Sequence, residues 1–113
     1  MAVINTEVSA RTLAEMARGF AAVGGKGNPE SEAMLIEAFK DGISRTRLLN
    51  YWLKTNAVEE IGFHPGRNSK EFRIRGESFF LHHSEPYPSA HMIAHMTFAI
   101  QYGPEPEEDD NGK

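Results

Sequence analysis

The chain has 113 residues, 40% hydrophobic and 25% charged, and its formal net charge is −4 at neutral pH. These values are typical of one soluble globular domain that can bury a modest core. There is no cysteine, which excludes disulfide bonds and thiolate metal sites, and no apolar stretch is long enough to cross a bilayer. Because the first residues also lack the pattern of a signal peptide, we expect a cytoplasmic protein with no membrane partner.

The charges are unevenly distributed along the chain. Five acidic residues lie in the last nine positions, and leaving out residues 105–113 leaves 11 basic and 11 acidic side chains. The segment from Lys40 to Gly76 contains eight basic residues and only four acidic ones. A basic central segment is what contact with nucleic-acid phosphates requires. Residues 104–113 contain no apolar side chain, so we expect them to form a disordered acidic tail.

The first predicted helix follows a short strand or arm at residues 1–8. Ser9 is a suitable N-cap, because its hydroxyl can accept a hydrogen bond from a free amide of the first turn. Apolar residues recur at helical spacing to about Val23, where the glycine-rich segment 24–27 ends the helix. We interpret that segment as a loop. It lacks the lysine followed by serine or threonine that ends a P-loop. The alternative interpretation is that the segment binds a phosphate group.

Two further helices are predicted before the middle of the chain. Asn28 followed by Pro29 is typical of a helix start, and Gly42 is expected to close this helix in a left-handed conformation. A third helix is expected to begin at Ser44 and to be amphipathic. Its apolar side comprises Leu48, Leu49, Trp52 and Leu53, and its polar side comprises Arg47, Asn50, Tyr51 and Lys54.

A β-hairpin is predicted after these helices. Residues 62–64 and the alternating segment Lys70–Arg75 are typical of strands, and the residues between them favour a turn. A further strand is expected over Ser78–His82. Residues 89–102 fit a strand and a helix about equally, and helix is favoured because Met and Ala are good helix formers.

This pattern, with a tight turn at Asp41-Gly42-Ile43 between the second and third helices, resembles a winged helix-turn-helix domain of the MarR/ArsR kind. The resemblance covers roughly residues 9–76 and is one of pattern, without an identifying motif. The sequence thus predicts an α+β fold: three N-terminal helices, a wing-like β-hairpin and a C-terminal helix or strand, forming a single domain over residues 1–103. The matching residues are Gly42-Ile43-Ser44-Arg45-Thr46-Arg47-Leu48-Leu49, Leu53, Gly62-Phe63, Gly66-Arg67 and Phe72-Arg73-Ile74.

In that family, the third helix enters the major groove of DNA and the wing contacts the backbone or the minor groove. The resemblance implies a non-enzymatic, nucleic-acid-binding regulator with double-stranded DNA as its partner and no cofactor. Cations of the helix would contact base edges, and those of the hairpin would hold phosphates. Glu59 and Glu60, beside the wing, depart from this pattern. The residues expected to contact nucleic acid are Arg45, Arg47, Asn50, Tyr51, Lys54, Arg67, Lys70, Arg73 and Arg75.

Four of the five histidines, His82, His83, His91 and His95, fall close together near the C-terminus. On a helix, His91 and His95 would share a face, at a spacing that lets two histidines bind the same metal ion. His82 or Glu85 could then supply a third ligand. No glutamate separates the pair as in a metalloprotease helix, and structural histidines are commoner, so we predict no metal site. No nucleophile elbow or other catalytic motif is present.

Several alternatives stay open. The basic residues could simply solvate a helix face. The chain could instead be a protein–protein interaction module, an inhibitor or an adaptor, that uses the acidic tail and exposed apolar surface. The tail could also lie over the basic face and compete with phosphate.

The remaining apolar residues support two more expectations. The methionine-containing segment from Ser89 to Ile100 is the expected surface of a homodimer. The large aromatic side chains are expected in the core, and an aromatic stacking surface for single strands is the alternative. These aromatic residues are Trp52, Phe72, Phe79 and Phe80.

Overall fold

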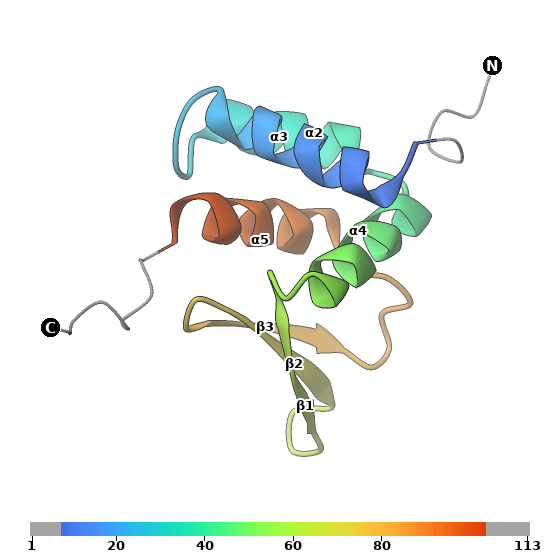
Figure 1. The fold of residues 1–113 in the computed structure, drawn as a ribbon. Coiled ribbons are helices and arrows are strands. Elements are labelled where there is room, and N and C mark those ends of the chain that lie inside the picture. The colour runs from blue at the N-terminus through green and yellow to red at the C-terminus, as the bar shows by residue number, and fades with distance from the viewer. Residues whose placement is uncertain (1–7, 104–113) are drawn as a thin grey trace, which may run out of the picture.

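The structure, a computed structural model, describes residues 8–103 and is drawn in Figure 1. The predicted α+β fold is confirmed: three N-terminal helices precede an antiparallel sheet, and a helix follows it. Residues 1–7, where a strand or arm was predicted, and the acidic tail lie outside the described residues. The elements are α2 (Ala10–Ala22), α3 (Pro29–Ala38), α4 (Gly42–Lys54), β1 (Glu59–His64), β2 (Ser69–Ile74), β3 (Glu77–His82) and α5 (Ala90–Tyr102).

Two helix starts lie where the sequence predicted them. The hydroxyl of Ser9 accepts a hydrogen bond of 3.1 Å from the amide of Thr12, at the start of α2. At the start of α3, the side chain of Asn28 accepts bonds from the amides of Glu30 and Ser31. Each cap satisfies a first-turn donor that has no partner inside its helix.

The turn between α3 and α4 differs from the prediction. Gly42 is the first residue of α4, and it does not cap α3 in a left-handed conformation. The helix begins two residues before the predicted start at Ser44. Its N-cap is Asp41, whose carboxylate accepts from the amide of Ser44 at 3.3 Å and from the hydroxyl of Ser44 at 3.1 Å. Glycine is needed at position 42 because a Cβ there would lie 2.4 Å from the ring of Tyr87.

Helix α5 lies at the centre of the molecule, between the α2 and α3 layer and the sheet, with α4 beside it (Figure 1). Ile93 and Met96 are fully buried, and the buried Thr97 hydroxyl donates to the carbonyl of Ile93. The choice of helix for this segment is therefore right. The predicted homodimer surface is wrong, because residues such as Met96 are packed inside the domain.

The sheet is antiparallel, with the order β1-β2-β3. Phe72 and Phe79 are paired across β2 and β3 and contribute to the core, whereas Glu71 and Phe80 are paired on the opposite face. Side chains alternate between the faces of a strand, so the prediction that Phe80 is a core residue is wrong. In the turn between β2 and β3, Arg75 (φ 50°) and Gly76 (φ 87°) both have positive φ, as a tight two-residue hairpin requires.

Candidate nucleic-acid interface

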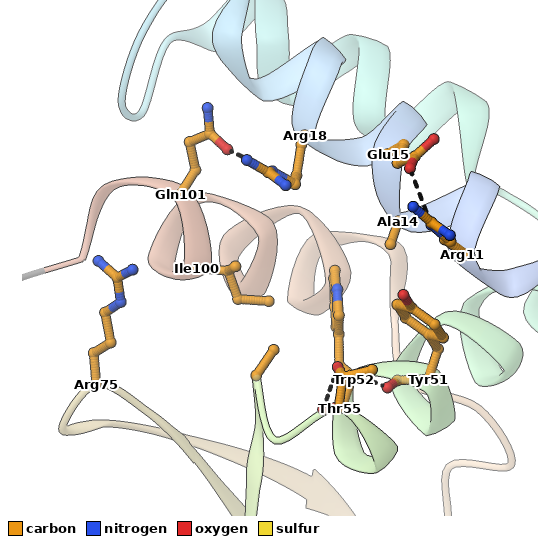
Figure 2. Close-up of a pocket in the computed structure, with 11 residues that line it drawn as sticks. Arg11, Ala14, Glu15, Arg18, Tyr51, Trp52, Thr55, Arg75, Ile100 and Gln101 are labelled. Carbon is orange, nitrogen blue, oxygen red and sulfur yellow. Dashed lines mark hydrogen bonds and ion pairs between the residues drawn. The ribbon is translucent and has the colours of Figure 1, made fainter.

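An open cleft of about 550 Å³ lies where α2, the end of α4, the β2–β3 turn and the end of α5 meet (Figure 2). We call it the arginine cleft. Ala14 and Trp52 are only 7% and 3% exposed, so they form its base, while exposed arginines form its rim. The lining residues are Arg11, Ala14, Glu15, Arg18, Tyr51, Trp52, Thr55, Ala57, Arg75, Ile100 and Gln101.

Regular backbone geometry brings the arginines of the cleft together. Arg11 and Arg18 are seven residues apart on α2, about two helical turns, so they lie on the same side of the helix. Arg75 lies in the β2–β3 turn, and its guanidinium donates to the carbonyl of Gly103 at 2.9 Å. Arg18 makes a long contact of 3.4 Å with the side-chain oxygen of Gln101.

The cleft has an excess of positive charge. Among the described side chains that line it, three are arginines and only Glu15 is acidic. Arg11 approaches Glu15 at 3.4 Å, but their side chains are 77% and 61% exposed. Exposed ion pairs are weak and exchange readily, so an incoming anion can compete with Glu15 for Arg11.

The predicted site residues of α4 are divided between different surroundings. Arg45 donates to the carbonyls of Phe39 and Pro88, which fastens the end of α3 and the loop before α5. These contacts hold Arg45, which was predicted to contact nucleic acid, against the protein's own backbone. Arg47 donates to the carbonyl of Val8, directly before α2.

Three other predicted residues of α4 remain accessible in different degrees. Asn50 and Lys54 are exposed, and Asn50 lines a second groove, between α4 and the sheet. Tyr51 is half-buried and lines the arginine cleft. Asn50 and Tyr51, both on the predicted polar side of this helix, therefore line two different hollows.

The cations of the hairpin mostly have partners within the protein. Lys70 lies 3.3 Å from Glu60 in an ion pair between β2 and β1. The guanidinium of Arg67 lies 3.7 Å from the ring centroid of Phe80. Arg73 pairs with Glu71, as described next, and only Arg75 of the predicted hairpin residues reaches the arginine cleft.

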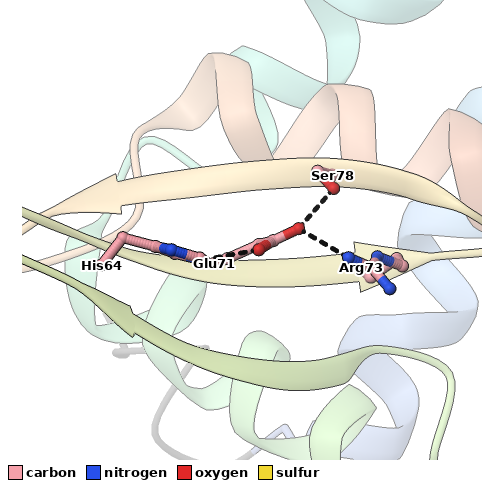
Figure 3. A network of polar contacts seen from close by, with 4 residues as sticks. All are labelled: His64, Glu71, Arg73 and Ser78. Atoms are coloured by element: carbon pink, nitrogen blue, oxygen red, sulfur yellow. Dashed lines mark hydrogen bonds and ion pairs between the residues drawn. The ribbon is translucent and has the colours of Figure 1, made fainter. Parts of the chain in front are cut away.

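Glu71 is the centre of a polar network on the outer face of the sheet (Figure 3). Its side chain is only 8% exposed, and it accepts from Ser78 at 2.6 Å, His64 at 2.7 Å and Arg73 at 3.0 Å. The hydrogen bond from Ser78, then those from His64 and Arg73, lower the pKa of Glu71 from 4.5 to about 2. Because the partners come from all three strands, this network fastens the sheet together.

The rings of His82 and His83 lie close together, with centroids 4.7 Å apart, whereas His95 belongs to α5. His95 contacts Glu32 at 3.1 Å and so links α5 to α3, whereas His82 bonds to Ser84 beside β3. Within residues 8–103, no three histidine, aspartate or glutamate side chains converge as they would around a metal ion.

Of the residues predicted to contact nucleic acid, Tyr51 and Arg75 line the arginine cleft, whereas Arg11 and Arg18 were not among those predicted. The seven-residue spacing of these two arginines was a usable signal, because it predicts a shared side of a helix. What the sequence could not supply was the partner surface, which the chain builds by bringing the β2–β3 turn and the end of α5 to the same place.

Comparisons with known proteins add no relatives, since no protein-family model, curated protein or solved structure matches this chain. The winged-helix resemblance accordingly stays a prediction. Over the described range 8–103, no helix has the length and apolar character needed to cross a membrane.

Proposed function

We propose that this protein binds nucleic acid through the arginine cleft. The observation that carries the proposal is the convergence of Arg11, Arg18 and Arg75, from α2 and the β2–β3 turn, on one concave surface with Glu15 as its only described acid. The proposed function is the one expected from the sequence, that of a non-enzymatic nucleic-acid-binding regulator. The proposed contact surface is the arginine cleft, in place of the surface of α4 and the hairpin that the sequence predicted.

The side chains of the cleft suit this ligand chemically. A guanidinium presents a planar fork of donors that matches two oxygens of one phosphate, and it stays charged at all physiological pH values. Tyr51 adds an aromatic ring beside the arginines. Cations combined with aromatic rings are a common means of holding a nucleic-acid strand.

The alternative surface, made by α4 and the hairpin, has less to offer phosphate. Arg45 is occupied by backbone carbonyls, and Lys70 and Arg73 already have carboxylate partners. A phosphate would compete with these partners for the cations. In the arginine cleft, the contacts to be exchanged are the exposed Arg11–Glu15 pair and the long Arg18–Gln101 contact, while Arg75 keeps further N–H donors beside the one bonded to the carbonyl of Gly103.

The test is a titration of labelled single-stranded and double-stranded oligonucleotides with the full chain and with residues 1–103, at several salt concentrations. We expect binding at low salt, with an affinity that falls steeply as salt rises because phosphate contacts release counterions. Absence of binding near 50 mM salt, with both forms of the protein, would remove the proposal.

A second candidate function, a protein–protein interaction module, is favoured by one observation. The groove between α4 and the sheet, about 380 Å³, is lined by Leu49, Leu53 and Leu81 among others, and Phe63 at this groove is 51% exposed. Phe63 belongs to β1, an edge strand of the sheet, and edge strands can pair with an extended peptide. A stoichiometric protein partner that survives nuclease treatment and is lost on Phe63→Ser would support this function.

A further inference from the structure

The arginine cleft is small and concave. Its volume of about 550 Å³ lies in the range of pockets that enclose a small molecule or one unit of a polymer. A duplex, in contrast, is read by a helix or ribbon that protrudes into a groove. A paired base of a duplex cannot turn into the cleft toward the ring of Tyr51, whereas an unpaired base can.

We infer that the arginine cleft takes an unpaired nucleotide, with the base against the half-buried Tyr51 and Ile100 and the phosphate among the arginines at the rim. This inference rests on the proposed function and names the class of nucleic acid. A nucleotide at a strand end, in a loop or in a single strand has the same chemistry as a free nucleoside monophosphate.

One part of the cleft offers apolar surface to a base. Ile100 and Ala57 are half-buried there, and they lie over Trp52 and Ala14, which are nearly buried and expose little surface of their own. Tyr51 is half-buried as well, so part of its ring is open to the cleft. Bases stack on aromatic rings with little dependence on sequence, which predicts a weak preference among the bases.

The rim offers the complementary contacts to phosphate and to polar base atoms. Arg11, Arg18 and Arg75 supply the positive charge. The amide of Gln101 has both a donor and an acceptor, and its contact with Arg18 at 3.4 Å is long enough to be exchanged for a ligand atom. Figure 2 shows Gln101 and Arg18 directed toward each other from α5 and α2.

The protein carries its own reporter for this site. Trp52 is the only tryptophan of the chain and lies at the base of the cleft. Its fluorescence should change when a base enters the cleft, and it should stay unchanged when an oligonucleotide binds elsewhere on the surface.

The experiment titrates the full chain with a single strand of about 12 nucleotides, a size suited to a small single-strand site, and with a blunt duplex of the same length. Affinity is followed by anisotropy of the labelled oligonucleotide, and the emission of Trp52 is recorded in parallel with unlabelled material. We expect at least tenfold tighter binding of the single strand and a change in Trp52 emission. Adenosine monophosphate, at millimolar concentration, should displace the single strand better than inorganic pyrophosphate does.

A pair of variants with the same charge change tests the position. Gln101→Glu keeps the size of the side chain and adds a negative charge in the cleft, so the affinity for the single strand should fall at least tenfold. Lys26→Gln makes the same change of charge in the loop between α2 and α3, outside the cleft. The affinity of this variant for the single strand should stay within about twofold of that of the natural protein. Thermal melts of both variants confirm that they fold.

The outcomes separate the inference from the proposed function. If the duplex binds as tightly as the single strand and Trp52 emission stays constant, the inference is wrong while nucleic-acid binding stands. Equal displacement by pyrophosphate would also overturn it, because the base would then contribute nothing. If neither oligonucleotide binds at low salt but adenosine monophosphate changes Trp52 emission, the cleft takes a free nucleotide and the proposed function fails.

Discussion

The arginine cleft and the β-hairpin are equally well supplied with basic residues, but they use them differently. In the hairpin, Lys70 and Arg73 have carboxylate partners, and Arg67 covers an aromatic ring. In the cleft, three arginines surround a hollow that holds one acidic side chain among the described residues, Glu15. The comparison teaches that a basic side chain can bind a ligand only if its partners within the protein leave it accessible. The number of basic residues nearby in the sequence does not show this.

The physical reason is the geometry of the two regions. Lys70 on β2 and Glu60 on β1 meet across an antiparallel pair of strands, where opposite charges come close together. In the cleft, arginines of one helix face a turn from a distant part of the chain, and a hollow separates them. The cations of the hairpin are therefore held by partners on the sheet, whereas Arg11 and Arg18 have only exposed or long contacts and, in our proposal, are available to a ligand.

The largest expected effect is on binding. Replacing both Arg11 and Arg18 with Ala should weaken oligonucleotide affinity roughly 100-fold, because each lost charged hydrogen bond typically corresponds to about tenfold in affinity. Fluorescence anisotropy at fixed low salt measures this. The matched control replaces Lys26 and Lys40, which do not line the cleft, and should change affinity less than about threefold.

The next effect is on stability. Glu71→Gln should lower the melting temperature clearly, since the amide cannot satisfy the donors of Ser78, His64 and Arg73 together. Binding of an oligonucleotide below the melting temperature should change little, because Glu71 is not part of the cleft. A large loss of affinity in a folded Glu71→Gln protein would contradict the separation of the two regions.

Glu71 also predicts a dependence of stability on pH. Its pKa is about 2 in the folded protein, against an ordinary value of 4.5, so the folded state favours the ionised carboxylate. The stabilisation is fully present above pH 4.5 and is lost as the pH falls from 4.5 toward 2. Urea unfolding at a series of pH values should show this loss in the natural protein, and it should be smaller in Glu71→Gln.

The smallest effect is expected for Lys70→Ala. Lys70 and Glu60 form an ion pair whose side chains are 44% and 48% exposed. Exposed pairs contribute about 0.2–1 kcal/mol, so the free energy of unfolding should fall by no more than that. Denaturant unfolding at neutral pH measures the difference. A loss of several kcal/mol would mean that this pair holds the hairpin in place, against our account.

Much of the fold could be predicted because its signals are local. The caps at Ser9 and Asn28 and the hairpin pattern depend on neighbouring residues alone. The N-cap at Asp41 was missed since Gly42 also fits a helix end, and its real role is to leave room for the distant Tyr87. The sequence also suggested an outer position for α5. Its apolar residues extend nearly all round the helix, which is typical of a buried helix.

The candidate site was harder to predict because it is built from distant segments. Arg45 fitted a nucleic-acid contact by its position on an amphipathic helix, but the carbonyl of Pro88 arrives from the other half of the chain. Arg11 and Arg18 become part of a cleft only when the β2–β3 turn brings Arg75 to its other end (Figure 2). Local patterns do not contain this information.

The most direct measurement compares two charge reversals in the same titration, Arg18→Glu in the cleft and Lys70→Glu in the hairpin. Both residues carry one positive charge, and both substitutions change the net charge by the same amount. Our account predicts that Arg18→Glu weakens the binding of a labelled single strand at least thirtyfold, while Lys70→Glu changes it by less than about threefold. Equal losses, or a larger loss for Lys70→Glu, would contradict it.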